Sequence, residues 1–157
     1  MRKYWGVWAL WGILGAILLR ILMLNDGVFL YTLDDPYIHL QFSTQLARGH
    51  FGLLPDEIAS PSSSILWPLL LVPFSLVDFH EFAPLAINIL AITASFLLWR
   101  RVLVRFVLAG DHPSEPGELA RASVLALLAL ITTNAVGLVF SGMEHSLQLT
   151  ATLAALT

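Results

Sequence analysis

The chain has 157 residues, of which 57% are hydrophobic and only 12% are charged, and its mean hydropathy is +0.79. This balance excludes an ordinary soluble domain and indicates an all-α, polytopic transmembrane helical protein. The net charge of −3 excludes little by itself, because the position of charges matters more than their sum in a membrane protein. The absence of cysteine excludes disulfides, thiolate metal sites and cysteine nucleophiles.

Four apolar segments are predicted to enter the membrane, since a span needs roughly 20 mostly apolar residues. They are residues 4–24, 83–99, 122–140 and 145–157 onward. The first segment follows Arg2 and Lys3 and lacks a small-residue cleavage pattern after Leu24, which favours an uncleaved anchor over a signal peptide. Because the chain stops inside an apolar run, we interpret 1–157 as the N-terminal part of a longer membrane domain.

A fifth apolar run, at 65–77, is shorter than the roughly 17 to 25 residues of a span and carries Pro68 and Pro73. We therefore predict a re-entrant or interfacial helix there. If this segment does not cross, most of the basic residues fall on one side of the membrane, as the positive-inside rule favours. They are Arg2, Lys3, Arg100, Arg101, Arg105 and Arg121, six of the eight Lys and Arg residues. Residues 25–82 then form one large outer loop, and residues 141–145 return to the same face.

A polar, acidic island at 33–39 follows the first span. Carboxylates next to the end of a membrane-spanning helix are energetically unfavourable, so they mark a candidate functional site. Asp35 is expected to N-cap a helix that Pro36 opens and Gly49 ends. Asp34 then has no capping role and lies beside the positive end of the helix dipole, which makes it our candidate general base. The alternative is that both acids are solvated loop residues.

The helix that starts at the acidic island is expected to lie along the membrane surface on an apolar stripe with a four-residue repeat. The stripe comprises Ile38, Phe42 and Leu46. The polar residues His39, Ser43 and Gln45 are expected on other faces of the helix. This arrangement would keep the outer loop close to the lipid headgroups.

The later part of the outer loop changes from acidic to hydroxyl-rich and then to apolar. Ser62, Ser63 and Ser64 could cap the short helix at 65–77, and the same groups could receive a phosphate. Trp67 is expected at the depth of the membrane interface, either as an anchor or as a ring that stacks on a sugar. Arg48 is the basic residue placed plainly in this loop, as a phosphate ligand or a solvated residue at a helix end.

Four short motifs occur in order along the chain: LDDPYI at 33–38, LARGH at 46–50, SPSSSILW at 60–67 and SGMEHSL at 141–147. Together they resemble the N-terminal part of polytopic GT-C membrane glycosyltransferases, especially the bacterial arabinosyltransferase-like and mannosyltransferase-like branch. The resemblance extends over essentially the whole chain. The sequence departs from the family pattern in Asp-Asp-Pro, where Asp-Asp-small is commoner, and in lacking an aromatic–glycine turn before Ser62.

The resemblance implies an inverting transferase that moves a sugar from a polyprenyl-phosphate donor to a glycan, lipid or protein acceptor. The reaction would take place on the outer face of the bacterial inner membrane, with membrane lipid as a partner and no nucleic acid. By position in the motif, Asp34 is the base that deprotonates the acceptor hydroxyl and Asp35 is its catalytic neighbour. No cofactor is required, although some transferases of this fold use a divalent metal at the acidic loop.

The remaining candidates are assigned to substrate binding. They are Tyr37, His39, Arg48, Ser62, Ser63, Ser64, Trp67, Glu144 and His145. Glu144 and His145 begin the fourth apolar segment and could face Asp34 across one cavity. A Glu-His pair can ligate a metal, but the sequence lacks a complete ligand set, so no metal ligand is assigned. The alternative function is a non-catalytic or truncated polytopic protein, either a scaffold or transporter-like, although no internal repeat supports a transporter.

Overall fold

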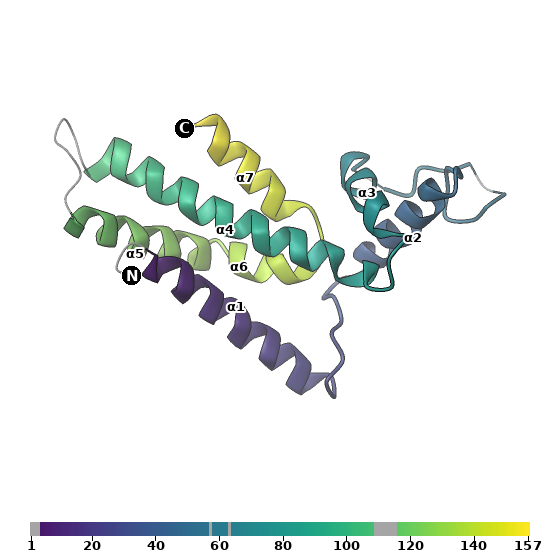
Figure 1. Cartoon of the computed structure of the whole chain (residues 1–157), viewed down its shortest axis with the longest axis horizontal. Coiled ribbons are helices and arrows are strands. Elements are labelled where there is room, and N and C mark those ends of the chain that lie inside the picture. Colours follow the sequence, from purple (N-terminus) through teal and green to yellow (C-terminus); the bar gives the residue numbers. More distant parts are fainter. Residues whose placement is uncertain (1–3, 57, 63, 109–115) are drawn as a thin grey trace.

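The computed structural model describes residues 4–56, 58–62, 64–108 and 116–157. Every regular element in these ranges is helical, which confirms the all-α prediction (Figure 1). The first half contains α1 (Trp5–Leu24), α2 (Asp35–Ala47), α3 (Leu66–Leu71), η1 (Val72–Phe74) and η2 (His80–Phe82). The second half contains α4 (Ala83–Leu103), the π-helical η3 (Val104–Leu108), α5 (Pro116–Thr132), α6 (Ala135–Leu138), η4 (Val139–Ser141) and α7 (His145–Ala155).

Two helical segments of the described chain are long and apolar enough to cross a membrane, Trp5–Leu24 and His80–Leu108. The first coincides with the segment predicted at 4–24. The second contains the segment predicted at 83–99, and it extends beyond it at both ends. A membrane protein with at least two apolar helices of spanning length is therefore supported by the fold.

The third apolar segment, predicted at 122–140, is bent where a continuous span was expected. The helical pieces Gly117–Thr132 and Ala135–Ser141 meet at an angle of 66°. Asn134 lies at the bend in the left-handed region, with φ of 56°. Just before it, the hydroxyl of Thr133 donates to the carbonyl of Ala129 at 2.7 Å, a side-chain bond that competes with helix continuation. The break lies where polar residues interrupt the apolar pattern.

Helix α4 occupies the centre of the bundle, with α7 on one side and α1 and α5 on the other (Figure 1). Gly6 allows α1 to approach closely, because a Cβ atom at this position would lie 2.6 Å from the ring of Phe96. Hydroxyl groups add a specific contact between helices, since the hydroxyl oxygens of Ser95 in α4 and Thr150 in α7 are hydrogen-bonded at 2.9 Å. Small residues and hydroxyl contacts of this kind are typical of helix packing in membranes.

The helices α2 and α3 lie together at one end of the bundle, where α1 ends and α4 begins (Figure 1). The turn between η4 and α7 reaches the same end. The 65–77 run folds as α3 and η1, which are too short to cross a membrane. The basic residues Arg100, Arg101 and Arg105 lie at the far end of α4 and in η3. The acidic island and the basic cluster therefore occupy opposite ends of the long central helix.

Helix α2 ends as predicted, with Ala47 as its last residue and Gly49 in the left-handed conformation at φ of 81°. The prediction of its packed face was wrong. His39, Ser43 and Gln45 are all buried, although they were expected to lie away from the packed side. The reason is that α3 folds back onto α2, so the helix packs against protein on its polar side as well.

Candidate functional site

Three segments that are far apart in the sequence meet at the α2 end of the bundle. They are the start of α2, the start of α3 and the turn that leads into α7. The indole N–H of Trp67 donates to the carbonyl oxygen of Gly142 at 3.2 Å. Trp67 is only 1% exposed, so it is a buried link between α3 and this turn.

Gly142 brings the turn into direct contact with the acidic island. Its φ of 74° lies in the left-handed region, which favours glycine. A Cβ atom at this position would lie 2.7 Å from carbons of both Pro36 and Tyr31. The turn is therefore pressed against the residue that follows the two aspartates, and no larger residue fits there without displacement.

Tyr31 anchors the acidic island to α4, a role that sequence reasoning missed. Its hydroxyl donates to the carbonyl of Glu81 at 2.6 Å and accepts the backbone N–H of Leu85 at 3.2 Å. Its own backbone N–H donates to the hydroxyl of Tyr37 at 3.1 Å, so Tyr37 is engaged in the loop itself. Burial raises the pKa of Tyr31, which keeps the phenol protonated and able to donate. A single tyrosine in an apolar stretch gave no signal of this role.

Asn88 is a second positioning residue that the sequence did not reveal. It is fully buried within α4, and its amide donates to the carbonyls of Met143 at 2.9 Å and Val139 at 3.3 Å. These bonds connect the turn to α4, in addition to the bond from Trp67 of α3. A side-chain amide in the middle of an apolar segment is energetically unfavourable unless it is hydrogen-bonded. The presence of Asn88 in such a segment was therefore the one sequence signal of its role.

The two aspartates lie exposed at the start of α2. The N-cap position belongs to Asp34 and not to Asp35, which corrects the prediction. The backbone of Asp34 is already close to helical, with φ of −84° and ψ of −27°, and its carbonyl accepts the N–H of Tyr37 at 3.0 Å. The side chain of Asp34 makes no capping hydrogen bond. The geometry thus gives neither carboxylate a capping role, and both remain near the positive end of the helix.

Glu144 and His39 lie behind the aspartates in a less exposed layer. One oxygen of Glu144, Oε1, accepts the amide N–H of Gln148 at 3.4 Å, whereas the buried Oε2 has no partner among the described residues. His39 is 3% exposed, and neither ring nitrogen has a partner in the described part of the chain. Burial lowers the pKa of His39, although Glu144 and Asp35 oppose this shift. His39 is therefore a neutral ring at pH 7 with little of its surface exposed.

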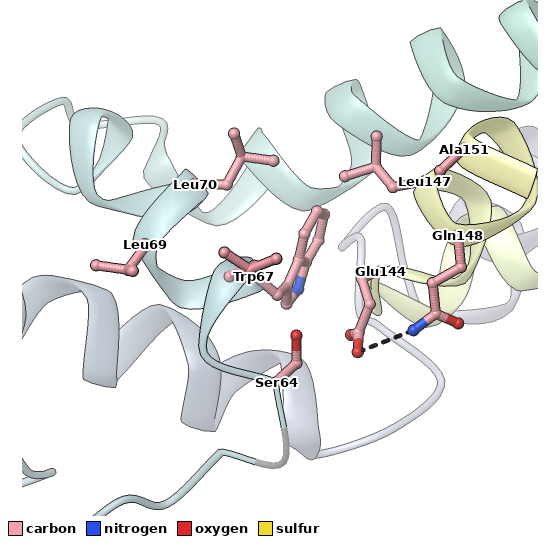
Figure 2. A pocket seen from close by; sticks show the side chains of 9 residues that line it. Ser64, Trp67, Leu69, Leu70, Glu144, Leu147, Gln148 and Ala151 are labelled. Carbon is pink, nitrogen blue, oxygen red and sulfur yellow. Dashed lines mark hydrogen bonds between the residues drawn. The ribbon is translucent and has the colours of Figure 1, made fainter. Parts of the chain in front are cut away.

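A cavity of about 570 Å³ opens beside this layer, between α3 and α7 (Figure 2). We call it the α3–α7 cavity. It is lined by Ser64, Leu66, Trp67, Leu69, Leu70, Glu144, Leu147, Gln148 and Ala151. Figure 2 shows the ring of Trp67 between Leu70 and Glu144, with Ser64 at the near edge. Three of the predicted substrate-binding residues, Ser64, Trp67 and Glu144, therefore share one cavity.

Other predicted residues are not brought to this cavity. Arg48 is exposed and follows the last residue of α2, so the 13-residue helix separates it from the aspartates by about 20 Å. His145 lines a different cavity, of about 180 Å³, with Thr133 and Ala135. The hydroxyl of Ser62 donates to the carbonyl of Ser64 at 2.6 Å and accepts its N–H at 3.1 Å, and Ser63 lies outside the described residues.

The described residues do not form a metal centre. No group of three or more His, Asp or Glu side chains in the described ranges is arranged to hold a metal ion. The acids at the start of α2 therefore do not form a complete metal site with other described residues.

Comparison with known proteins gives no relative. No protein-family model matches the chain, and neither the curated proteins nor the solved structures contain a match. The class of protein is therefore defined by the fold alone, as a helical membrane protein with a polar site at one end of its bundle.

Proposed function

We propose that the chain forms the N-terminal part of an inverting GT-C-type membrane glycosyltransferase. It would move a sugar from a polyprenyl-phosphate donor to an acceptor hydroxyl on the outer face of a bacterial inner membrane. The observation that supports the proposal is the meeting of three of its four motifs. The LDDPYI, SPSSSILW and SGMEHSL segments come together through the contact of Gly142 with Pro36 and its hydrogen bond from Trp67.

The chemistry of the site suits sugar transfer. A sugar on a lipid phosphate has a charged leaving group, so the enzyme mainly needs a base for the acceptor hydroxyl. Asp34 and Asp35 are exposed carboxylates at the start of α2, so an acceptor hydroxyl can reach them. We assign the base to Asp34 and the supporting role to Asp35. The donor phosphate also needs a cationic or N–H partner, and none of the residues that line the α3–α7 cavity is cationic.

The proposal places the start of α2, α3 and the 142–144 turn outside the membrane and the Arg100–Arg105 end of α4 in the cytoplasm. The support is the charge pattern, because cytoplasmic ends of spans carry an excess of Lys and Arg. Arg100 and Arg101 lie in the last turn of α4 and Arg105 in the following η3, away from the aspartates. The active site would then face the compartment in which polyprenyl-linked sugars are used for the cell envelope.

The proposal is tested by replacing the two aspartates separately in the full-length protein, reconstituted in liposomes. Radiolabelled mannosyl and arabinosyl polyprenyl phosphates serve as donors. Asp34→Asn keeps the size of the side chain but removes the proton acceptor, so we expect transfer to fall by about 10²-fold or more. Asp56→Asn, at an exposed acid of the same loop, is the matched control and should keep normal transfer.

The outcomes separate the assignments. Loss of transfer in Asp35→Asn with normal transfer in Asp34→Asn would move the base to Asp35. Normal transfer in both variants would exclude the enzyme proposed here. Absence of transfer in the unaltered protein with either donor would favour the non-catalytic alternative, a scaffold or a transporter-like protein.

A further inference from the structure

The α3–α7 cavity has walls of two different kinds. Leu66, Leu69 and Leu70 from α3 and Leu147 and Ala151 from α7 give it apolar sides. Leu69 and Leu70 are 48% and 43% exposed, so these side chains have no complete packing partner in the described fold. The volume of about 570 Å³ lies in the range of small-molecule sites, roughly 300 to 1,000 Å³. The shape and lining suit a hydrocarbon chain.

The polar groups gather at one end of the cavity. Ser64, Glu144 and Gln148 lie there, and Figure 2 shows the Glu144 carboxylate between the other two. Gln148 satisfies only Oε1 of this carboxylate, at 3.4 Å. The buried Oε2 lacks a donor in the described part of the chain, although a buried acceptor without a partner is unfavourable. Oε2 is enclosed by protein and out of reach of a ligand, whereas the hydrogen bond at Oε1 is exposed and long, so Oε1 can accept a further hydrogen bond from a ligand in the cavity.

The charge of this polar end restricts the head group of the ligand. Glu144 contributes a carboxylate, and none of the lining residues is cationic. A phosphate head group would bring further negative charge next to this carboxylate, so it is disfavoured. A hydroxyl is neutral and donates, and it is complementary to both the charge and the exposed acceptor.

We infer that the α3–α7 cavity binds an uncharged, hydroxyl-bearing amphiphile. Its hydrocarbon chain lies between the leucines of α3 and Leu147 of α7, and its hydroxyl donates to the exposed Oε1 of Glu144. The ring of Trp67, which is held by its hydrogen bond to Gly142, forms part of the wall next to the head group. In the transferase proposed above this ligand is the acceptor, and that assignment rests on the proposed function.

Binding is tested in lipid nanodiscs with two probes that share a brominated dodecyl chain, an uncharged β-glucoside and a phosphate monoester. Bromine quenches tryptophan fluorescence at short range. Trp67 is isolated as the reporter by changing the other four of the five tryptophans to Phe, with helical content checked by circular dichroism. We expect saturable quenching by the glucoside, with an affinity at least about tenfold above that for the phosphate, from the charge-assisted hydrogen bond.

Matched variants locate the site. Ala151→Phe fills the cavity and should weaken glucoside binding by about tenfold or more, because the chain no longer fits. Ala154→Phe makes the same change at an exposed position of α7 outside the cavity lining and should leave binding unchanged. Glu144→Gln keeps the shape of the side chain but removes its charge, and it should reduce the preference for glucoside over phosphate.

Non-saturable quenching that is equal for both probes would mean partition into lipid only and would overturn the inference. Equal losses in Ala151→Phe and Ala154→Phe, or an unchanged preference in Glu144→Gln, would also overturn it. The assay requires no sugar transfer, so it is independent of the test on Asp34. Specific binding without transfer would keep the site and remove its assignment as the acceptor site.

Discussion

The close contact of Gly142 with the acidic island gives the sharpest test of how the site is assembled. Gly142→Ala adds one methyl group at a left-handed φ of 74°. A left-handed conformation costs a residue with a Cβ about 1–2 kcal/mol. The new Cβ would also lie 2.7 Å from carbons of Pro36 and Tyr31, well inside the roughly 3.5–4.0 Å of normal carbon contacts.

Neither neighbour moves easily, since the Pro36 ring is rigid and Tyr31 is held by hydrogen bonds to Glu81 and Leu85. Overpacking of this kind costs about 1–3 kcal/mol, which gives a total of about 2–5 kcal/mol for Gly142→Ala. Gly49→Ala is the matched control, because Gly49 has φ of 81° and a Cβ added there would meet no atom within 4 Å. It should lose only the backbone part, about 1–2 kcal/mol.

The assay is denaturant unfolding of both variants in detergent micelles, followed by circular dichroism at constant detergent concentration. We expect the free energy of unfolding to fall more for Gly142→Ala than for Gly49→Ala, by about 1–3 kcal/mol. Equal losses would refute the packing of the 142–144 turn against α2. If the free energy of unfolding fell as much in Gly49→Ala as is expected for Gly142→Ala, the left-handed backbone conformation alone would explain both losses.

Two further predictions concern pH and topology. Burial lowers the pKa of His39 in the folded protein below its ordinary value of 6.5. As the pH falls through 6.5, His39 is therefore protonated in the unfolded chain before it is protonated in the folded one, and the free energy of unfolding decreases. His39→Gln should therefore show a smaller fall in Tm between about pH 7 and pH 5 than the unaltered protein, with Glu144 and Asp35 kept, and an equal fall would contradict this role. In the cysteine-free chain, single cysteines at Asp56 and Arg101 should react with an impermeant maleimide from opposite sides of the membrane, Asp56 from the outside. Labelling of both from one side would contradict the charge rule.

The helices themselves could be predicted because their signals are local. An apolar run of spanning length marks α1 and α4, and Gly49 marks the end of α2. The bend at Asn134 was missed, because a short polar stretch inside an apolar run does not by itself show that the helix breaks there. The N-cap was misplaced by one residue, since Asp34 and Asp35 are chemically equivalent caps and only the backbone conformation distinguishes them.

The site could be predicted only in part because its contacts are long-range. Trp67 and Gly142 are 75 residues apart, and their hydrogen bond has no local trace in the sequence. Glu144 was proposed to face Asp34 across one cavity, and the cavity that it lines is shared with Ser64 and Trp67, whereas Asp34 is not among the lining residues. Asn88 and Tyr31 were overlooked because their roles depend on carbonyls and N–H groups that folding brings to them.

The carboxylates of the site are in two environments, and this difference favours separate roles. Asp34 and Asp35 are exposed at a helix start, where an acceptor hydroxyl can reach them from the solvent. Glu144 is half-buried, with one oxygen tied to Gln148 and the other facing no described donor, which suits a fixed hydrogen-bond acceptor better than a mobile base. The turn that carries Glu144 packs on Pro36 through Gly142, so the position of the binding carboxylate and that of the proposed base are set by the same contact. A change in this turn should therefore disturb both the ligand cavity and the proposed base, whereas a change at the far wall of the cavity, such as Ala151→Phe, should weaken binding of the ligand and leave the position of the base unchanged.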